Sequence, residues 1–315
     1  MDHAAGPGPT PINKVAVLIN PAAGSVTTTT EAEVVGLLRS LHIEPQIYTA
    51  TGPALENALK TAIAGHPDLL AVIAGDGTAR AAAELCGPAG ILLAPLPGGT
   101  MNVLPKALYG PRQWQVALGE ALEDGVVRDI SGGEIDGHVF FVAAIVGSPA
   151  LWAGAREAAR AFKPVTAAKL AGTALDQAFK GRLRFALEGH PPGKAQALTL
   201  LCPLISHELD DSDAFMEAAS VDPGGPVGVF RLAFHALVND WRSDPGVVTW
   251  RCRRGWVKSR RPIPAVIDGE PVTLNSLAKI GFRFRAFRAL TPRLGPKVHS
   301  GQQVLDAWLS LTPPL

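Results

Sequence analysis

Two glycine-rich turns contain residues that could bind a phosphate group. The first, Gly75-Asp76-Gly77-Thr78, follows the apolar run 69–74, and the second, Pro97-Gly98-Gly99-Thr100-Met101-Asn102, follows the run 91–94. Glycines let the backbone approach a phosphate, and the N–H groups at a helix start attract an anion. Asp76 would repel a phosphate, so it indicates either a Mg²⁺ ion between the two or a bound ribose hydroxyl.

The side chains of Thr100 and Asn102 could donate hydrogen bonds to a phosphate or a base. Taken singly, each turn is also compatible with an ordinary turn before a helix. Neither matches a Walker A loop or a G-x-G-x-x-G fingerprint, so standard P-loop and Rossmann nucleotide sites are poorly supported.

A third group, Asp268-Gly269-Glu270, follows the expected strand 264–267. Asp-Gly is common in turns, so this group is also compatible with an ordinary turn. However, residues 245–293 contain only these two acidic residues against 11 basic ones. Carboxylates in such a basic region are candidates for a catalytic base or a metal ligand.

The elements that must position these turns alternate between strand and helix. Such alternation in short units predicts a parallel α/β sheet, and ligands bind at the carboxyl ends of its strands. The expected strands are 14–19, 44–49, 69–74 and 91–94, and the expected helices are 30–41, 54–64, 79–85 and 114–123.

Beyond residue 130 the pattern changes to strands separated by Gly/Pro turns, which predicts a mostly antiparallel β domain. The expected strands there are 139–146, 182–188, 197–204, 227–237, 247–258, 263–267 and 280–290, with helices at 151–179 and 302–311. We therefore expect a flexible leader (1–13), an α/β domain (14–130), a β domain (131–296) and a C-terminal helix (297–315) that could pack back on the first domain.

Charge is segregated along the chain. Residues 1–130 carry 7 basic and 12 acidic side chains, residues 131–240 carry 9 and 12, and residues 241–315 carry 13 and 4. The formal net charge of +1 therefore hides a strongly basic last quarter. This asymmetry indicates an anionic partner, either a nucleic acid or a membrane surface.

The overall composition, with 47% hydrophobic and 18% charged residues, is typical of a folded globular protein. The three cysteines are far apart, which favours reduced thiols and no zinc site. The uncharged run 137–155 is interrupted at Gly147-Ser148-Pro149, so a buried strand is expected there and not a membrane span. The start of the chain does not resemble a signal peptide, so we expect a cytoplasmic protein.

Four motifs in order resemble the diacylglycerol-kinase catalytic-domain family, which includes bacterial lipid kinases, sphingosine kinases and ceramide kinases. They are Asn20-Pro21-Ala22-Ala23-Gly24, the two glycine-rich turns, and Asp268-Gly269-Glu270. The resemblance spans about residues 14–293, with further matches at 129–141 and Asp222. NAD kinases and phosphofructokinases are more distant relatives of this family.

The resemblance implies an α/β domain of the NAD-kinase and diacylglycerol-kinase type followed by an antiparallel β-sandwich domain, with ATP and Mg²⁺ as cofactors. The expected catalytic residues are Glu270, Asp268 and Asp76. The resemblance implies that Glu270 accepts the proton of a lipid hydroxyl, with Asp268 near the Mg²⁺ network and Asp222 at a structural metal site. The implied nucleotide-binding residues are Asn20, Thr49 or Thr51, Gly75, Asp76, Gly77, Thr78, Gly98, Gly99, Thr100 and Asn102.

The chain departs from the family pattern at several positions. Ala74 replaces the first of two glycines, Arg80-Ala81 replaces Asn-Glu, Val103 replaces an acid, and Asp222 is followed by proline. These departures concern the arrangement of Mg²⁺ more than the class of reaction.

The expected activity is phosphorylation of the primary hydroxyl of diacylglycerol or of a ceramide or sphingoid lipid. The alternatives are a soluble-substrate kinase of the NAD-kinase type and a non-catalytic nucleotide-binding protein. The basic C-terminal region, with Trp250 and Trp256 among its cations, is expected to meet an anionic membrane surface as a peripheral protein. Nucleic acid is not expected as a partner, and a homodimer is left open.

Overall fold

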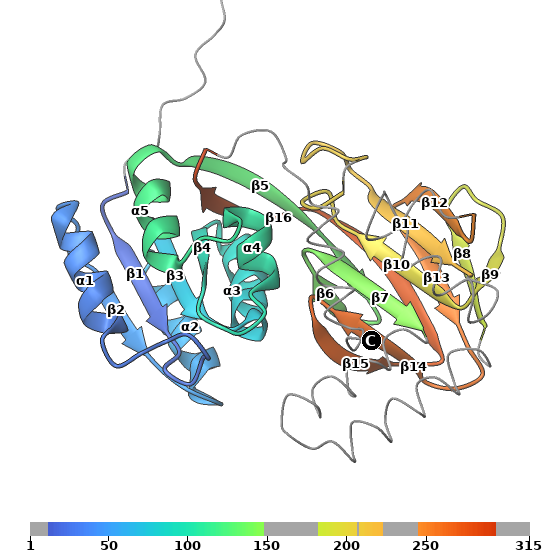
Figure 1. The fold of residues 1–315 in the computed structure, drawn as a ribbon, viewed down its shortest axis with the longest axis horizontal. Coiled ribbons are helices and arrows are strands. Elements are labelled where there is room, and N and C mark those ends of the chain that lie inside the picture. The colour runs from blue at the N-terminus through green and yellow to red at the C-terminus, as the bar shows by residue number, and fades with distance from the viewer. Residues whose placement is uncertain (1–11, 148–181, 207, 223–244, 294–315) are drawn as a thin grey trace, which may run out of the picture. The chain divides into compact units, whose positions relative to one another are not determined.

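The computed structural model describes residues 12–147, 182–206, 208–222 and 245–293. These residues form two compact units, one containing 12–129 and 285–293 and the other the described part of 130–284. The two boundaries lie within strands β5 (Val126–Ile135) and β16 (Leu277–Thr291) (Figure 1).

The first unit is built on parallel strands in the order β2-β1-β3-β4. The last residues of β16 extend this sheet, because Arg288 and Ala289 pair in parallel with β4. The strands are β1 (Val15–Ile19), β2 (Gln46–Thr49), β3 (Leu69–Ala74) and β4 (Leu92–Pro97), and the helices are α1 (Thr30–Ser40), α2 (Ala54–Ala64), α3 (Asp76–Ala89), α4 (Val103–Tyr109) and α5 (Trp114–Asp124).

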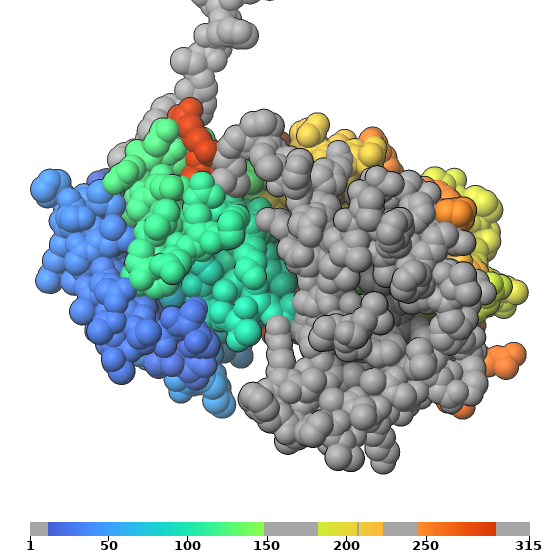
Figure 2. Space-filling view, viewed as in Figure 1, coloured from blue at the N-terminus to red at the C-terminus, as the bar shows by residue number. Residues whose placement is uncertain are grey.

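Every residue of β1 and β3 is buried, as expected for parallel strands covered on both faces. Two groups of neighbouring helices pack on the sheet, α1 with α5, and α2 with α3 and α4. The side chains of α1 and α5 meet at the surface (Figure 2), where Gln115 donates a 2.9 Å hydrogen bond to Glu33.

The second unit is a sandwich of antiparallel strands. One sheet has the order β12-β11-β10-β7-β14-β15, and the other contains the first part of β16 followed by β13, β8 and β9. The strands are β6 (His138–Phe140), β7 (Ala143–Gly147), β8 (Leu183–Leu187), β9 (Gly193–Ala195), β10 (Ala197–Leu201), β11 (Met216–Val221), β12 (Val247–Cys252), β13 (Arg254–Lys258), β14 (Ile263–Ile267) and β15 (Glu270–Leu274).

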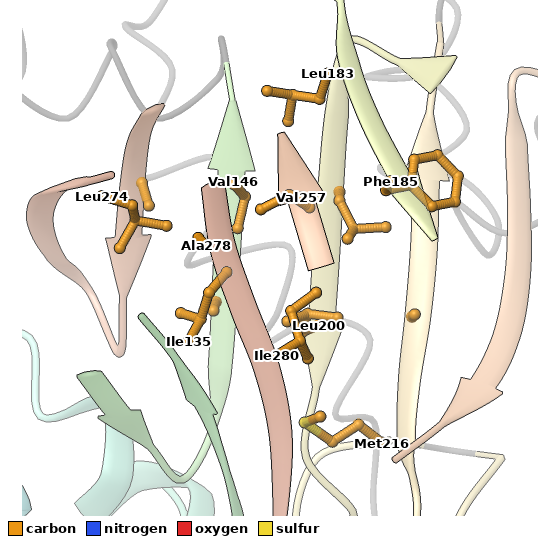
Figure 3. Packing of buried hydrophobic residues seen from close by; sticks show 14 of the residues in the cluster. Ile135, Val146, Leu183, Phe185, Leu200, Met216, Val257, Leu274, Ala278 and Ile280 are labelled. Carbon is orange, nitrogen blue, oxygen red and sulfur yellow. The ribbon is translucent and has the colours of Figure 1, made fainter. Parts of the chain in front are cut away.

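Buried side chains from both sheets form the core of this unit. Figure 3 shows Val146 and Leu200 from the first sheet beside Val257 and Ile280 from the second. Because successive side chains of a strand point to opposite faces, the neighbours of these residues in sequence lie on the outer faces of the sandwich.

The expected fold class, an α/β unit followed by an antiparallel β unit, is confirmed. Sequence reasoning missed α4, β5, β9, β11 and β15, and it joined β12 and β13 into one strand. The expected elements at 151–179, 227–237 and 302–311 lie partly or wholly outside the described residues.

The division of the chain differs from the expected one in one respect. The first boundary falls after Asp129, but residues 285–293, expected in the second domain, belong to the first unit. The single strand expected over 139–146 is divided into β6 and β7, which belong to different sheets. None of the helices in the described ranges is both long and apolar enough to span a membrane.

Candidate functional site

Three loops of the first unit are joined by backbone hydrogen bonds at the carboxyl ends of β1, β3 and β4. The N–H of Asn20, after β1, donates to the carbonyl of Ile73 at 3.0 Å. The N–H of Ser25 donates to the carbonyl of Gly98 at 2.9 Å, and the N–H of Gly98 donates to Ala74 at 3.1 Å. The expected turns therefore lie together at one edge of the sheet.

The glycines of the second turn are required by close backbone contacts. A Cβ at Gly98 would lie 2.5 Å from the nitrogen of Ala74, and one at Gly99 would lie 2.7 Å from the Cα of Gly75. No side chain fits in either place without a shift of the backbone. The two turns consequently pack against each other through main-chain atoms.

Gly75 differs from these two glycines. A Cβ at Gly75 would meet nothing within 4 Å, so this position borders open space. Gly75 is also the N-cap of α3, and no side chain among the described residues caps this helix start. The first-turn N–H groups of α3, which belong to the predicted residues Asp76, Gly77 and Thr78, lack partners within the helix and suit an anion.

The Asp76 carboxylate joins the two turns. Its Oδ1 accepts a 2.5 Å hydrogen bond from the N–H of Val103, at the start of α4. Since this helix start carries a partial positive charge, it stabilises the ionised carboxylate. The contact explains how an acid can stand beside a turn that is predicted to bind phosphate, and sequence reasoning missed it because α4 was not expected.

Asn102 shapes the second turn from within. Its side-chain Oδ1 accepts the N–H of Gly99 at 2.7 Å, and its Nδ2 donates to the Gly99 carbonyl at 2.9 Å. Asn102 is 8% exposed and has a φ of +53°, a conformation that asparagine tolerates better than most residues. In this structure Asn102 therefore supports the turn, whereas the exposed Thr100 lies at its surface.

The other residues predicted to bind nucleotide lie near the end of β1. The Asn20 side chain accepts the N–H of Ala22 at 3.0 Å. Thr49 pairs with Ile19 at the ends of β2 and β1, and its hydroxyl donates to Glu31 at 3.2 Å. Thr51 is exposed two residues beyond. Of these two threonines, Thr49 is thus the one held at the sheet edge by a contact.

In the second unit, Asp268-Gly269 forms the turn of the β14–β15 hairpin. Ile267 pairs with Glu270, so the turn has two central residues, and both have positive φ angles, +46° for Asp268 and +87° for Gly269. These angles are those of a type I′ turn, in which Asp-Gly is a favoured sequence. The ordinary turn considered from the sequence is thus present, and it belongs to a hairpin.

The Asp268 carboxylate binds the backbone between β6 and β7. Its Oδ2 accepts the N–H of Phe141 at 2.8 Å, and its Oδ1 accepts those of Val142 and Ala143, both at 2.9 Å. Asp268 is only 3% exposed. Burial raises the pKa of the nearby Cys202 thiol well above its ordinary value, and the negative charge of Asp268 raises it further.

This geometry bears on the expected role of Asp268. A buried carboxylate with both oxygens bonded to the main chain fits a residue that fixes the hairpin, and fits a metal ligand or a reacting group poorly. Glu270, the first residue of β15, is half-buried and follows this fixed turn directly. The two predicted catalytic carboxylates therefore have different surroundings, since Asp268 is buried and bonded to the main chain and Glu270 is half-buried.

Asp222 provides mixed support for a metal ion. Its Oδ2 accepts a 2.5 Å hydrogen bond from Arg182, while its Oδ1 is buried and finds no hydrogen-bond partner within the described residues. An orphaned oxygen suits a cation, but the Arg182 guanidinium already neutralises the carboxylate. Across the described ranges, no three His, Cys, Asp or Glu side chains come close enough together to hold a metal ion.

The predicted residues thus form two groups, each within one unit. The loop residues around Asn20, Gly75 and Gly98 belong to the first unit, and Asp222, Asp268 and Glu270 belong to the second. The first group has the glycine-lined backbone and the helix start that a phosphate site requires. Residues 14–135 match the family model of the diacylglycerol kinase catalytic domain.

This match to the diacylglycerol kinase catalytic domain includes both glycine-rich turns and ends within β5. It confirms the resemblance inferred from the motifs for this part of the chain. Among curated proteins, a sequence search finds no significant match.

Solved structures extend the likeness to the second unit. A diacylglycerol kinase from Bacillus anthracis superposes with a TM-score of 0.67 at 16% identity, covering 92% of this chain and 100% of its own. A second structure from that organism, assigned to the same class of enzyme, gives 0.69 at 17% identity and covers 90% and 99% of the two chains. At such identities the likeness establishes the fold.

Proposed function

We propose that the protein is an ATP-dependent lipid kinase that transfers the γ-phosphoryl group to the primary hydroxyl of a neutral membrane lipid, either diacylglycerol or a ceramide or sphingoid lipid. The observation that carries the proposal is the pair of backbone-lined turns at Gly75 and Gly98, in the segment that matches the diacylglycerol kinase catalytic domain. The fold shared with solved structures over both units supports it.

The first unit fits the phosphates of a nucleotide. Gly98 and Gly99 are buried and let the two turns pack together through main-chain atoms, and the start of α3 offers N–H groups beside the open space at Gly75. When bound, Mg²⁺-ATP supplies the phosphoryl group, and the metal neutralises its developing charge. Asp76 and the turn residues 98–102 would hold this group in the proposed site.

The second unit supplies the proposed base. Glu270 begins β15 immediately after a turn whose conformation is fixed by three hydrogen bonds to the Asp268 carboxylate. We assign to Glu270 the removal of the proton from the lipid hydroxyl, and to Asp268 the positioning of the turn. Removing a general base typically slows the reaction by about 10²- to 10⁴-fold.

The decisive experiment offers γ-labelled ATP and Mg²⁺ with diacylglycerol, ceramide or sphingosine in neutral detergent micelles, and with NAD in solution. The proposal expects a labelled lipid from one of the three lipid acceptors. Glu270→Gln should lower the turnover by about 10²-fold or more while nucleotide affinity stays nearly unchanged. Glu188→Gln, a change of an exposed glutamate in the same unit, serves as the matched control.

The alternatives give different results in this assay. A labelled product from NAD and from none of the lipids would assign a soluble-substrate kinase of the NAD-kinase type. Nucleotide binding without any labelled product would assign a non-catalytic nucleotide-binding protein. Wild-type turnover by Glu270→Gln would remove Glu270 from the mechanism even if the protein proved to be a lipid kinase.

A further inference from the structure

A row of basic side chains crosses one sheet of the second unit. Register places Lys194 of β9 opposite Arg184 of β8, and Arg184 opposite Lys258 of β13. Lys258 in turn stands opposite Leu277 of β16. Three cations from three neighbouring strands therefore lie side by side, although they come from positions up to 74 residues apart in the chain.

These side chains lie on the outer face of the sandwich. The residues that precede or follow them, such as Val257 and Leu183, belong to the buried core (Figure 3). Alternation along a strand then directs Arg184 and Lys258 outward, and all three cations of the row are exposed. We call Arg184, Lys194 and Lys258 the basic row.

The basic row is electrostatically unfavourable within the molecule. Like charges that stand directly opposite each other on neighbouring strands destabilise a sheet. Within the described part of the chain, no hydrogen bond or ion pair involves the side chains of the basic row. Some other cations of this unit are occupied, since Arg251 donates to the Glu208 carbonyl at 2.8 Å and Arg253 to the Ala214 carbonyl at 2.7 Å.

Apolar side chains border the basic row on the same face. Leu277, at the end of the row, is 49% exposed. Trp256, two residues before Lys258 and therefore on the same face, is half-buried and stands opposite Lys279. Tryptophan and aliphatic residues among cations are typical of surfaces that meet a lipid bilayer, because the apolar groups enter the interface while the cations face lipid headgroups.

Among the described residues, acids lie at two edges of this face. On the β16 side, Glu134 accepts from Arg283 at 2.6 Å and Asp136 accepts from the N–H of Asn275 at 2.8 Å. Glu188 follows β8, and its N–H donates to the carbonyl of Arg254 at 2.9 Å, so the two residues are neighbours two positions beyond Trp256. The basic row itself has no acid opposite any of its members. A sheet face whose basic row has no acid opposite it complements an anionic surface.

We propose that the outer face of β9, β8, β13 and β16 is a docking surface for an anionic lipid bilayer, with the basic row contacting headgroups and Leu277 and Trp256 contacting the interface. The proposal rests on the proposed function, because a kinase for a membrane lipid must reach its acceptor at a bilayer. It also includes Arg184 and Lys194, which lie outside the basic last quarter of the sequence.

The test measures sedimentation of the full chain with vesicles of phosphatidylcholine, or of an equimolar mixture of phosphatidylcholine and phosphatidylglycerol. The row variant combines Arg184→Gln, Lys194→Gln and Lys258→Gln. Its partition onto mixed vesicles should fall by about 100-fold, since each basic residue near an anionic leaflet contributes about 1 kcal/mol and a tenfold change corresponds to 1.4 kcal/mol. Binding to pure phosphatidylcholine should be weak for both proteins.

The matched control combines Arg39→Gln, Lys60→Gln and Arg293→Gln. It removes the same number of charges from exposed ion pairs of the first unit, where such pairs stabilise little. Vesicle binding of the control should stay close to that of the wild type. An equal loss in both variants, or no loss in the row variant, would overturn the proposal.

Two further measurements separate the remaining outcomes. Urea unfolding should show that the row variant is as stable as the wild type or slightly more stable, because a repulsion has been removed. Binding to single-stranded DNA that depends on the row more strongly than vesicle binding does would overturn the lipid assignment. Row-dependent vesicle binding by a wild-type protein that phosphorylates no lipid would refute the proposed function and leave the docking surface standing.

Discussion

Replacement of Asp268 by asparagine separates a structural role from a catalytic one. The substitution keeps the size of the side chain, and asparagine also tolerates the φ of +46° at this position. It removes the negative charge and turns one of the two acceptor oxygens into an NH₂ donor. If Asp268 fixes the hairpin through its three backbone hydrogen bonds, Asp268→Asn must lower the free energy of unfolding.

The size of the loss follows from the three bonds. In the best orientation, the amide oxygen keeps the N–H groups of Val142 and Ala143, and the NH₂ group faces the N–H of Phe141. An unsatisfied buried N–H costs about 1–3 kcal/mol, and changing a charged acceptor to a neutral one weakens each remaining bond by about 1 kcal/mol. The expected loss is therefore about 3–5 kcal/mol.

Asp136→Asn is a matched control. Asp136-Gly137 forms a two-residue turn of the same kind between β5 and β6, with φ angles of +53° and +83°. The Asp136 carboxylate binds only the backbone and side-chain N–H groups of Asn275, and it is half-exposed. Water can replace such contacts, so this substitution should cost about 1 kcal/mol or less.

Urea unfolding followed by tryptophan fluorescence, with lipid phosphorylation measured on the same samples, decides the point. If Asp268 has the structural role, Asp268→Asn should unfold at a lower urea concentration than the wild type. Its activity per folded molecule should then equal that of the wild type. A variant as stable as Asp136→Asn but with a changed Mg²⁺ requirement would refute the structural role and restore Asp268 as a metal-linked residue.

Three other predictions concern the turns, the thiols and Asp222. Gly98→Ala should destabilise the protein by about 1–3 kcal/mol in urea unfolding, because its Cβ would lie 2.5 Å from a backbone nitrogen; Gly75→Ala should keep its stability and weaken nucleotide binding, measured by calorimetry. Burial raises the pKa of Cys86 and Cys252 to about 12, so the unfolded chain loses these protons at a lower pH than the folded chain does. The free energy of unfolding should therefore fall between about pH 9 and pH 12. Native thiols should also resist alkylation at pH 8 and react once urea is added. Arg182→Gln should increase any stabilisation by added Mg²⁺ in thermal unfolding, because it frees a carboxylate with an orphaned oxygen; no difference from the wild type would remove Asp222 as a cation site.

The turns could be predicted from the sequence because their chemistry is local. An apolar run followed by Gly-Asp-Gly-Thr has few local solutions other than a buried strand that turns into a helix, and β3 and α3 meet at that point. The expected bounds of β3 and α2 agree with the observed ones. A turn at Asp268-Gly269 was likewise indicated, because Asp-Gly is common in turns, and both residues have positive φ angles.

The partners of the acidic side chains could not be predicted, because they depend on contacts across the fold. Asp76 accepts its hydrogen bond from a residue 27 positions away, and Asp268 from residues 125 to 127 positions away. Neither distance leaves a periodic trace in the sequence. Both aspartates were expected beside Mg²⁺, and in both cases the structure shows that main-chain N–H groups occupy carboxylate oxygens.

Contacts across the fold divide the described cations of the basic last quarter of the chain into paired and unpaired ones. Three of its arginines are paired with acids of segment 124–134, so their charges are largely neutralised. Others, on β13 and β16, alternate with core residues and point outward, where Arg184 and Lys194 from earlier in the chain join them. A count along the sequence therefore combines cations that are already paired with cations that remain available to a partner. The property that an anionic surface would recognise is the alignment of charges across neighbouring strands, which is set by strand register. The paired residues are Arg283 with Glu134, Arg285 with Asp129, and Arg293 with Asp124.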